Sequence, residues 1–276
     1  MKENEVKVNF KESYAKIAGE KSGFRPPGYK GERKDRHEKY DSRTIGYPLD
    51  DLRSGPEGIN LGLGCGSPVA LASLQEGEVV VDLGSGTGFD CFLAVQKVGS
   101  TGKVIGVDMT LEMVNRARRS AEEGGYLNVE FRLGEIENLP LADNSINVVI
   151  SNCVINLAQD KTKVFQEAFR ALKPGGRMMI SDIVLTRELP MIIKESVEGY
   201  HACVSGAMIK DEYLDCIELA GFQEIKVLDQ IPFPLDLLIN DPTAKGILQE
   251  VEIDPMEANK MSETIVHLKV QAYKRS

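Results

Sequence analysis

The chain has 276 residues, of which 42% are hydrophobic and 27% charged, so it can bury one sizeable core with appended elements. Its formal net charge is -9, which gives no electrostatic support for binding nucleic acid or a membrane surface, and we expect neither partner. No run of about 20 apolar residues predicts a transmembrane helix. The charged start MKENEVKVNF lacks the apolar centre of a signal peptide, so the sequence predicts a cytoplasmic protein.

Residues 1–72 show little of the apolar periodicity of a packed core, apart from a candidate short helix near residues 11–19. They are rich in charges and contain two turn signals, FRPPGYKG and SGPEG. Segments of this kind can close over an active site and exclude water from it. We therefore interpret residues 1–72 as an N-terminal cover segment, and this segment carries Cys65.

From residue 73 onward, buried strand patterns alternate with amphipathic helix patterns. The predicted strands span residues 78–84, 102–108, 128–134, 146–152 and 177–184, and the predicted helices span residues 88–99, 111–125 and 160–176. Such alternation predicts βαβ units with right-handed crossovers and a mostly parallel sheet. Residues 73–185 are therefore predicted to form a doubly wound α/β core.

Residues 186–276 are predicted to complete the sheet and to contribute to the site of the second substrate. Two further helix candidates span residues 190–200 and 209–220, and two strand candidates span residues 222–229 and 265–274. The last strand is a candidate for an edge of the sheet. Between these strands, residues 231–257 have an irregular pattern with several prolines.

A glycine-rich loop, VVVDLGSGTGFD, follows the first predicted strand of the core and opens a helix. Glycines there let the backbone approach a nucleotide-like ligand closely. The loop alone also fits a nicotinamide enzyme. However, the spacing is G-x-G-x-G, and the carboxylates of Asp82 and Asp90 flank it, which is unfavourable for a pyrophosphate. The acids favour S-adenosylmethionine, which carries a cationic amine and a sulfonium.

The ends of the next two strands carry residues suited to the rest of that cofactor. Asp108 ends the second strand, 20 residues after Gly88, and can accept hydrogen bonds from both ribose hydroxyls. Met109 can pack on the adenine, whose edge is expected near residues 134–136. The predicted cofactor-binding set is Asp82, Gly84, Ser85, Gly86, Gly88, Asp108, Met109, Gly134, Glu135, Ile136 and Asn152.

Five segments together, DLGSGTGFD, GVDMT, LGEIE, SNCVINL and LKPGGR, resemble the arsenite methyltransferase family. The resemblance runs from about Leu63 to Ala207, and SNCVINL is its most specific motif. It implies a class I methyltransferase fold, a Rossmann-like sheet of seven strands in the order 3-2-1-4-5-7-6. In that fold strand seven is antiparallel, and ligands lie at the carboxyl ends of the strands.

The resemblance also implies a role for three cysteines. Cys65 in GLGCGSP, Cys153 in SNCVINL and Cys203 in HACVSGA occupy motif positions at which the family holds arsenic. We therefore predict these three as the catalytic residues and as ligands of arsenic(III). Soft thiolates suit trivalent arsenic better than oxygen ligands do. Positioning then accounts for catalysis, because a lone pair on arsenic can attack the sulfonium methyl without a general base.

The other cysteine features are less specific. Five cysteines without a CxxC pair argue against a disulfide framework and a zinc ribbon. Cys91 and Cys216 are expected to be small buried apolar residues. His201 either lowers the pKa of the nearby Cys203 thiol or is simply exposed to solvent. Family members often have a cysteine upstream of the GCG motif; none precedes Cys65 here, so an external thiol reductant is the expected partner.

Three other functions fit parts of the sequence. A methyltransferase acting on carbon or oxygen, like the quinone-biosynthesis enzymes, would need an apolar pocket and a base such as His201 or Asp182. A non-catalytic arsenical-binding or cofactor-sensing protein would share the cysteines or the loop. A nicotinamide dehydrogenase is disfavoured by Asp82 and Asp90. The separation of the Cys153 and Cys203 sulfurs would discriminate, because arsenic can bridge them only if they are close.

Overall fold

The computed structural model describes residues 66–188, 206–232 and 263–275 of the chain. It also describes residues 12, 14, 15, 18, 47, 55, 56, 58–61 and 64. The following expectations from the sequence lie outside the described residues: the helix at 190–200, most of the irregular tract at 231–257, Cys65, His201 and Cys203.

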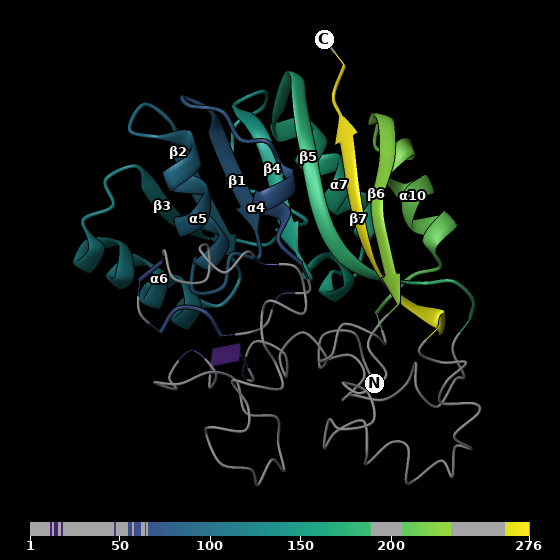
Figure 1. Ribbon diagram of the computed structural model, residues 1–276, viewed down its shortest axis with the longest axis horizontal. Helices are drawn as coiled ribbons and strands as arrows, with labels where there is room; N and C mark the ends of the chain where they lie inside the picture. Colours follow the sequence, from purple (N-terminus) through teal and green to yellow (C-terminus); the bar gives the residue numbers. More distant parts are fainter. Residues whose placement is uncertain are drawn as a thin grey trace, which may run out of the picture.

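Seven strands form one mixed sheet (Figure 1). They are β1 (Val79–Leu83), β2 (Lys103–Asp108), β3 (Val129–Leu133), β4 (Ile146–Asn152), β5 (Leu172–Leu185), β6 (Gln223–Pro232) and β7 (Ile265–Tyr273). Their order across the sheet is β3-β2-β1-β4-β5-β7-β6, and β7 runs antiparallel to both of its neighbours. The strand order and orientation expected from the resemblance are therefore confirmed.

Helices cover both faces of this sheet (Figure 1). They are α4 (Pro68–Leu71), α5 (Phe89–Val98), α6 (Leu111–Gly124), the 3-10 helix η1 (Ile155–Leu157), α7 (Lys161–Ala171) and α10 (Lys210–Leu219). Val80 of β1 packs with α4, α5 and α6, whereas Val81 and Leu83 pack with α7 and α10. Because both faces are covered, the central strands are nearly continuous apolar runs.

The predicted helix over residues 160–176 is five residues too long. It ends at Ala171, and β5 begins at Leu172, which pairs with Ile146 of β4. Pro174 is the reason, because it lacks an N–H and disfavours a helical conformation at Lys173. The predicted strand over residues 177–184 is accordingly extended at its start.

The prediction that the last strand is a candidate for a sheet edge is wrong. β7 lies between β5 and β6, and its first four residues are all buried. The apolar residues Ile265, Val266 and Leu268 therefore occupy both faces of this part of the strand, because an interior strand is covered on both faces. The edge strand on this side of the sheet is β6, in which most side chains are exposed.

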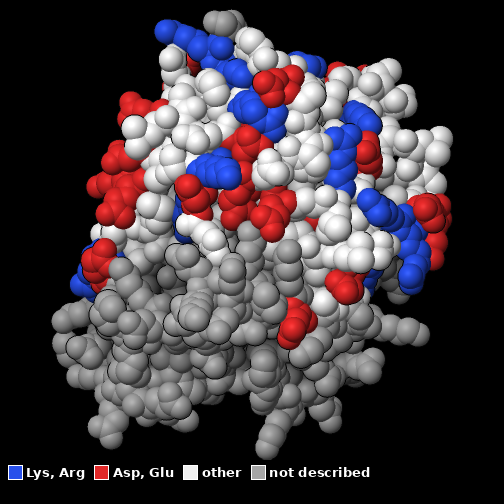
Figure 2. Space-filling view, turned by 180° about the vertical axis from the view of Figure 1, so that it is seen from behind, with Lys and Arg blue, Asp and Glu red and all other residues white. Residues whose placement is uncertain are grey.

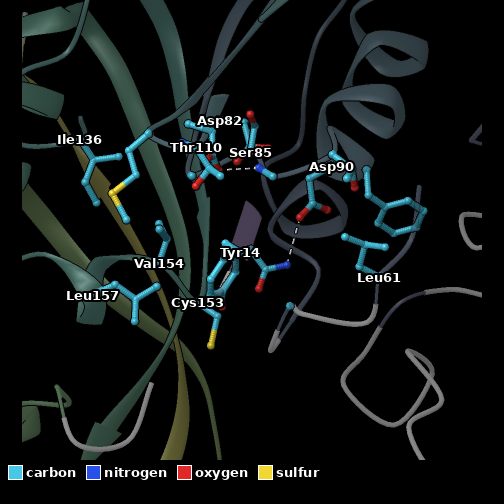
Figure 3. A pocket seen from close by; sticks show the side chains of 18 of the residues that line it. Tyr14, Leu61, Asp82, Ser85, Asp90, Thr110, Ile136, Cys153, Val154 and Leu157 are labelled. Atoms are coloured by element: carbon cyan, nitrogen blue, oxygen red, sulfur yellow. Dashed lines mark hydrogen bonds between the residues drawn. The ribbon is translucent and has the colours of Figure 1, made fainter. Parts of the chain in front are cut away.

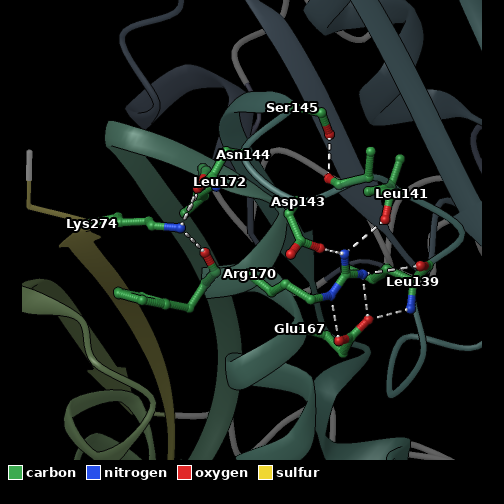
Figure 4. Close-up of polar contacts among 11 residues, drawn as sticks. Leu139, Leu141, Asp143, Asn144, Ser145, Glu167, Arg170, Leu172 and Lys274 are labelled. Carbon is green, nitrogen blue, oxygen red and sulfur yellow. Dashed lines mark hydrogen bonds and ion pairs between the residues drawn. The ribbon is translucent and has the colours of Figure 1, made fainter.

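The loop that leads from β3 to β4 is fastened to α7 by one guanidinium group (Figure 4). Arg170 donates hydrogen bonds to the carbonyl oxygens of Leu139 and Leu141 and to the carboxylates of Asp143 and Glu167. The pKa of Arg170 is raised, chiefly by hydrogen bonds to the Glu167 and Asp143 carboxylates. Glu167 in turn accepts a hydrogen bond from the Leu139 N–H at 2.8 Å.

Lysine and arginine side chains are interspersed with aspartate and glutamate on the face shown in Figure 2. That face therefore has no continuous basic tract of the kind that binds a polyanion. Within the described part of the chain, no helix is long and apolar enough to cross a bilayer.

Replacing Arg170 tests whether it holds the loop. Arg170→Ala should lower the free energy of unfolding by about 1–3 kcal/mol, because two carbonyls and two carboxylates lose a half-buried donor. The pKa of Glu167 is lowered chiefly by its hydrogen bond from Arg170. The difference from the wild type should therefore shrink as the pH falls through the pKa of Glu167 and the carboxylate becomes protonated.

Urea unfolding at several pH values measures this effect. Arg119→Ala is the matched control, because Arg119 is an exposed arginine on α6. Equal losses of stability in the two variants would contradict the proposed role of Arg170.

Candidate active site

One pocket opens at the carboxyl ends of β1, β2 and β4 (Figure 3). Neighbouring parallel strands end there, and the chain leaves β1 and β4 toward opposite faces of the sheet, which is where ligands bind in open α/β folds. The core contributes the loop after β1, the ends of β2 and β4, and the loop after β3. Residues from the N-terminal segment complete the lining: Tyr14, Tyr47, Ile59, Asn60, Leu61 and Gly64.

The loop after β1 depends on glycine for two different reasons. Gly84 has φ +67°, and a Cβ there would lie 2.7 Å from the Cβ of Val154 in the loop after β4. Gly86 has φ +53°, but a Cβ there would meet no atom within 4 Å, because the backbone borders open pocket space. Gly84 therefore permits close packing behind the loop, and Gly86 lets a ligand approach the backbone.

Asp108 is held rigidly at the end of β2. Its Oδ2 accepts a hydrogen bond from the Gly86 N–H at 2.9 Å, and its Oδ1 accepts one from the Thr110 N–H at 2.8 Å. Burial nevertheless raises the pKa of this carboxyl. Each carboxylate oxygen can accept a second hydrogen bond, so the group can also receive two hydroxyls of a ligand.

The pocket is strongly acidic. Among the described residues that line it, four are acidic and none is lysine, arginine or histidine. Burial raises the pKa of Asp82 well above its usual value, and the negative charges of Asp90 and Asp108 raise it further. The Cys91 thiol donates a hydrogen bond to Asp82 at 3.4 Å but brings no positive charge. Such a pocket favours a cationic ligand and disfavours phosphate.

Two residues of this site, Tyr47 and Asp90, were missed by the prediction of binding residues. Tyr47 donates its hydroxyl to both oxygens of Asp90, at 2.9 and 3.0 Å. The Asn152 Nδ2 donates to Asp90 at 3.0 Å, as drawn in Figure 3. The sequence marked Asp90 only as a charge beside the glycine loop. It gave no signal for Tyr47, which lies 43 residues from Asp90 in a segment without periodicity.

Cys153 lies directly after β4 in an unusual backbone conformation. Its φ is +58°, in the left-handed region that residues other than glycine rarely adopt. The N–H of Cys153 donates to the carbonyl oxygen of Ser181 on β5 at 2.8 Å. The side chain is buried but lines the pocket, and its sulfur points away from Asp82 and Ser85 (Figure 3). Strain of this kind is typical of functional positions.

Most of the predicted site residues that the structure describes lie together. The residues that line the pocket are Asp82, Gly84, Ser85, Gly86, Asp108, Met109, Gly134, Ile136, Asn152 and Cys153. Gly88 and Glu135 do not line it: Gly88 caps α5, and Glu135 bridges to Asn138. The binding roles of all these residues stay predictions. Cys91 and Cys216 are buried in the core, as expected.

Asp182, the base considered for a carbon or oxygen acceptor, lies in the interior of β5 and does not line the pocket. It accepts hydrogen bonds from the side chains of Asn156 and Tyr213. Burial raises the pKa of Asp182 to about 7. Its partners give this group a structural role beneath η1.

Comparison with known proteins identifies the family. A family model described as a methyltransferase domain matches residues 74–221. The arsenite methyltransferase of Halobacterium salinarum is 50% identical over 193 residues, which are 70% of this chain and 49% of that protein. A crystal structure of an arsenic(III) S-adenosylmethionine methyltransferase from Chlamydomonas reinhardtii is 30% identical, with a TM-score of 0.61, and the match covers 83% of this chain and 71% of that one.

The chain belongs to the methyltransferase-domain family, and within it to the arsenite methyltransferases. A second arsenite methyltransferase, from Aquipseudomonas alcaligenes, is 40% identical over 62% of this chain and 51% of that protein. This member of the family thus spans about half the length of these curated relatives. A ubiquinone/menaquinone biosynthesis C-methyltransferase from Legionella pneumophila matches a shorter region, 34% identical over 41% of this chain and 45% of that protein.

The two glycines of the loop should respond differently to substitution. Gly84→Ala should destabilise the fold more than Gly86→Ala, because it adds a collision with Val154 to the cost of a left-handed alanine, which is about 1–2 kcal/mol. Gly86→Ala should instead place a methyl group in the pocket and weaken ligand binding. Urea unfolding and calorimetric titration of the two variants separate these effects. Equal stability of the two variants would refute the packing role of Gly84.

The buried carboxylates should make the ligand-free protein less stable as the pH rises. The folded-state pKa of Asp82 is raised, so its penalty is absent well below its usual pKa and grows as the pH rises toward the folded value. Asp82→Asn should therefore unfold at a higher urea concentration than the wild type at pH 7, with little difference near pH 3. Glu123→Gln, which changes an exposed acid on α6, is the control. Identical pH profiles for Asp82→Asn and the wild type would rule out the penalty.

Proposed function

We propose that this chain transfers methyl groups from S-adenosylmethionine to trivalent arsenic held by cysteine thiolates. One observation carries the proposal: the same pocket is lined by four carboxylates, with no lysine, arginine or histidine among its described lining residues, and by the Cys153 thiol. The carboxylates suit a cationic methyl donor, and the thiol suits a soft acceptor. The resemblance of the chain to arsenite methyltransferases supports both assignments.

The residues of the pocket fit the methyl donor. Ser85 Oγ is buried and has no hydrogen-bond partner among the described residues, so the site offers an unused polar atom. Asp108 would accept the ribose hydroxyls, and Asp82 and Asp90 would face the cationic end. The loop from Gly134 to Ile136, with Met109, would receive the adenine. When bound, the sulfonium supplies an electrophilic methyl group, and its departure leaves a neutral thioether.

The substrate would be held by thiolates. Arsenite carries three hydroxyl groups, and each thiol that binds arsenic displaces one of them as water. Cys153 is the described ligand, and the family motifs add Cys65 and Cys203. The bound arsenic keeps one lone pair, which attacks the methyl carbon. No proton leaves the nucleophile in this step, so the pocket needs no general base, and positioning supplies most of the effect.

The N-terminal segment is proposed as a cover of this site. Tyr14, Tyr47 and Gly64 line the pocket together with the core, which supports this role. Residues 73–185 would then bind the cofactor, and residues 186–276 would complete the sheet and the acceptor site. Exclusion of water would protect the arsenic–sulfur bonds during transfer.

An external thiol is proposed as the reductant. Cys91 and Cys216 are buried, so neither is a natural candidate for relaying electrons from the site to the surface. The sequence contains no cysteine before Cys65. A small-molecule thiol, or a thiol protein, would therefore restore the cysteines after each cycle. A cytoplasmic location, where thiols stay reduced, is still a prediction from the sequence.

Transfer of a labelled methyl group tests the proposal against its alternatives. The wild type should label arsenite, and Cys153→Ser should lose activity on both arsenite and methylarsenite. Cys65→Ser should lose activity mainly on arsenite, because methylarsenite has only two exchangeable positions. Cys203→Ser should lose both activities, and Cys216→Ser should keep both, apart from a modest stability loss from a buried hydroxyl.

Product speciation by chromatography gives the answer. Labelling of a quinol precursor in place of arsenite would favour a carbon acceptor. Tight arsenite binding without any labelled product would favour a non-catalytic arsenical-binding protein. Wild-type activity of Cys153→Ser on arsenite would exclude the three-thiolate mechanism.

A further inference from the structure

The amide group of Asn152 connects three separate parts of the chain. Asn152 is the last residue of β4 and directly precedes Cys153. Its Nδ2 lies 2.7 Å from the carbonyl oxygen of Gly66, 2.6 Å from the Tyr47 hydroxyl and 3.0 Å from Asp90 Oδ2. An amide nitrogen has two hydrogens, so at least one of them is shared between acceptors. One side chain thus joins β4 to the glycine-rich turn before α4 and to the start of α5.

Gly64 and Gly66 lie directly on the end of β4 and on Ser181 of β5 beside it. A Cβ added at Gly64 would lie 2.6 Å from Asn152 Nδ2, and a Cβ at Gly66 would lie 2.8 Å from the Cβ of Ser181. Neither glycine has a positive φ. The two positions therefore need glycine for space, because any side chain would lift the turn off Asn152 and Ser181.

The strands under this turn also carry Cys153. The Cys153 N–H donates to the Ser181 carbonyl at 2.8 Å, so the residue under Gly66 also fixes the backbone of Cys153. Cys65 stands between the two glycines in the sequence. A displacement of these two glycines from the end of β4 would therefore also displace the residue that links them.

We propose that Asn152 is a positioning residue that fixes the turn of Gly64 and Gly66 against the end of β4. Asn152 thereby sets the place of Cys65 relative to Cys153, an inference that rests on the proposed three-thiolate function. The role of Asn152 as a cofactor ligand stays a prediction, and its amide nitrogen is directed to the turn, Tyr47 and Asp90. Asp90 should keep the bifurcated hydrogen bond from the Tyr47 hydroxyl when the amide is removed, so the cofactor end of the pocket depends less on Asn152.

Asn152→Ala separates the turn from the cofactor end. Arsenite methylation should fall roughly 10–100-fold, because a displacement of about 1 Å of a reacting group has effects of this size. Activity on methylarsenite, which two thiols can hold, should fall much less. The affinity for S-adenosylmethionine, measured by calorimetry, should change by less than about threefold. A threefold change corresponds to roughly 0.65 kcal/mol, which is less than a typical hydrogen bond contributes. Asn147→Ala, on the opposite end of β4, is the matched control, because Asn147 is also hydrogen-bonded there.

A readout without methylation keeps the two proposals distinguishable. The alkylation rate of Cys65, followed by mass spectrometry of its peptide, should change in Asn152→Ala and stay at the wild-type value in Asn147→Ala. If the wild type methylates neither arsenical, the proposed function fails, and the alkylation rate still decides whether Asn152 fixes the turn.

A double-mutant cycle tests direct contact. Gly64→Ala alone collides with the Asn152 amide and should change the Cys65 alkylation rate, whereas in the Asn152→Ala background the added methyl has room and should have little further effect. If Asn152→Ala does not fold, Gly64→Ala alone still tests the contact, because it disturbs the turn and leaves Asn152 intact. Additive effects of the two substitutions would overturn the proposal. So would equal losses on arsenite and methylarsenite in Asn152→Ala, or an unchanged alkylation rate.

Discussion

Negative charge gathered in one pocket at the ends of the strands is the constraint on which the site depends. Three aspartates meet at the ends of two neighbouring strands and at the start of the helix between them, and burial with mutual repulsion raises the pKa of Asp82. Among the residues that the structure describes, the donors that hold them in place are neutral: a tyrosine hydroxyl, an amide, a thiol and backbone N–H groups. Neutral donors satisfy hydrogen bonds but leave the charge, so the pocket retains a field that a cationic ligand can neutralise.

Much of the fold could be predicted because its causes are local. Buried strands, amphipathic helices and the glycines between them determine the order of elements along the chain. Pro174 could have corrected the helix over residues 160–176, because its missing N–H acts on its immediate neighbours. The interior place of β7 is different: the resemblance implied it through the strand order, but the local pattern did not. A segment such as IVHL, with one histidine among three apolar residues, indicates burial on both faces only when its neighbours are known.

The polar network of the site could not be read from spacing. The place of Asp82 and Asp108 in the pocket could be predicted, because each lies at the end of a strand that the local apolar pattern locates. Tyr47 meets Asp90 across 43 residues from a segment without periodicity. Asn152 was recognised as a residue of the site, but its contact with Gly66 crosses 86 residues. Contacts of this kind depend on where the N-terminal segment lies, which no local pattern encodes.

The left-handed conformation of Cys153 explains how two adjacent residues serve one pocket. Successive side chains of a regular strand point to opposite faces of a sheet, so Asn152 and Cys153 could not both line the same cavity if β4 continued. At φ +58° the chain leaves strand geometry at residue 153, and both side chains line the pocket. The hydrogen bond from the Cys153 N–H to Ser181 holds this strained turn in place. Strain at one residue thus lets the end of β4 present an amide to the carboxylate side of the pocket and a thiol to the side away from Asp82 and Ser85.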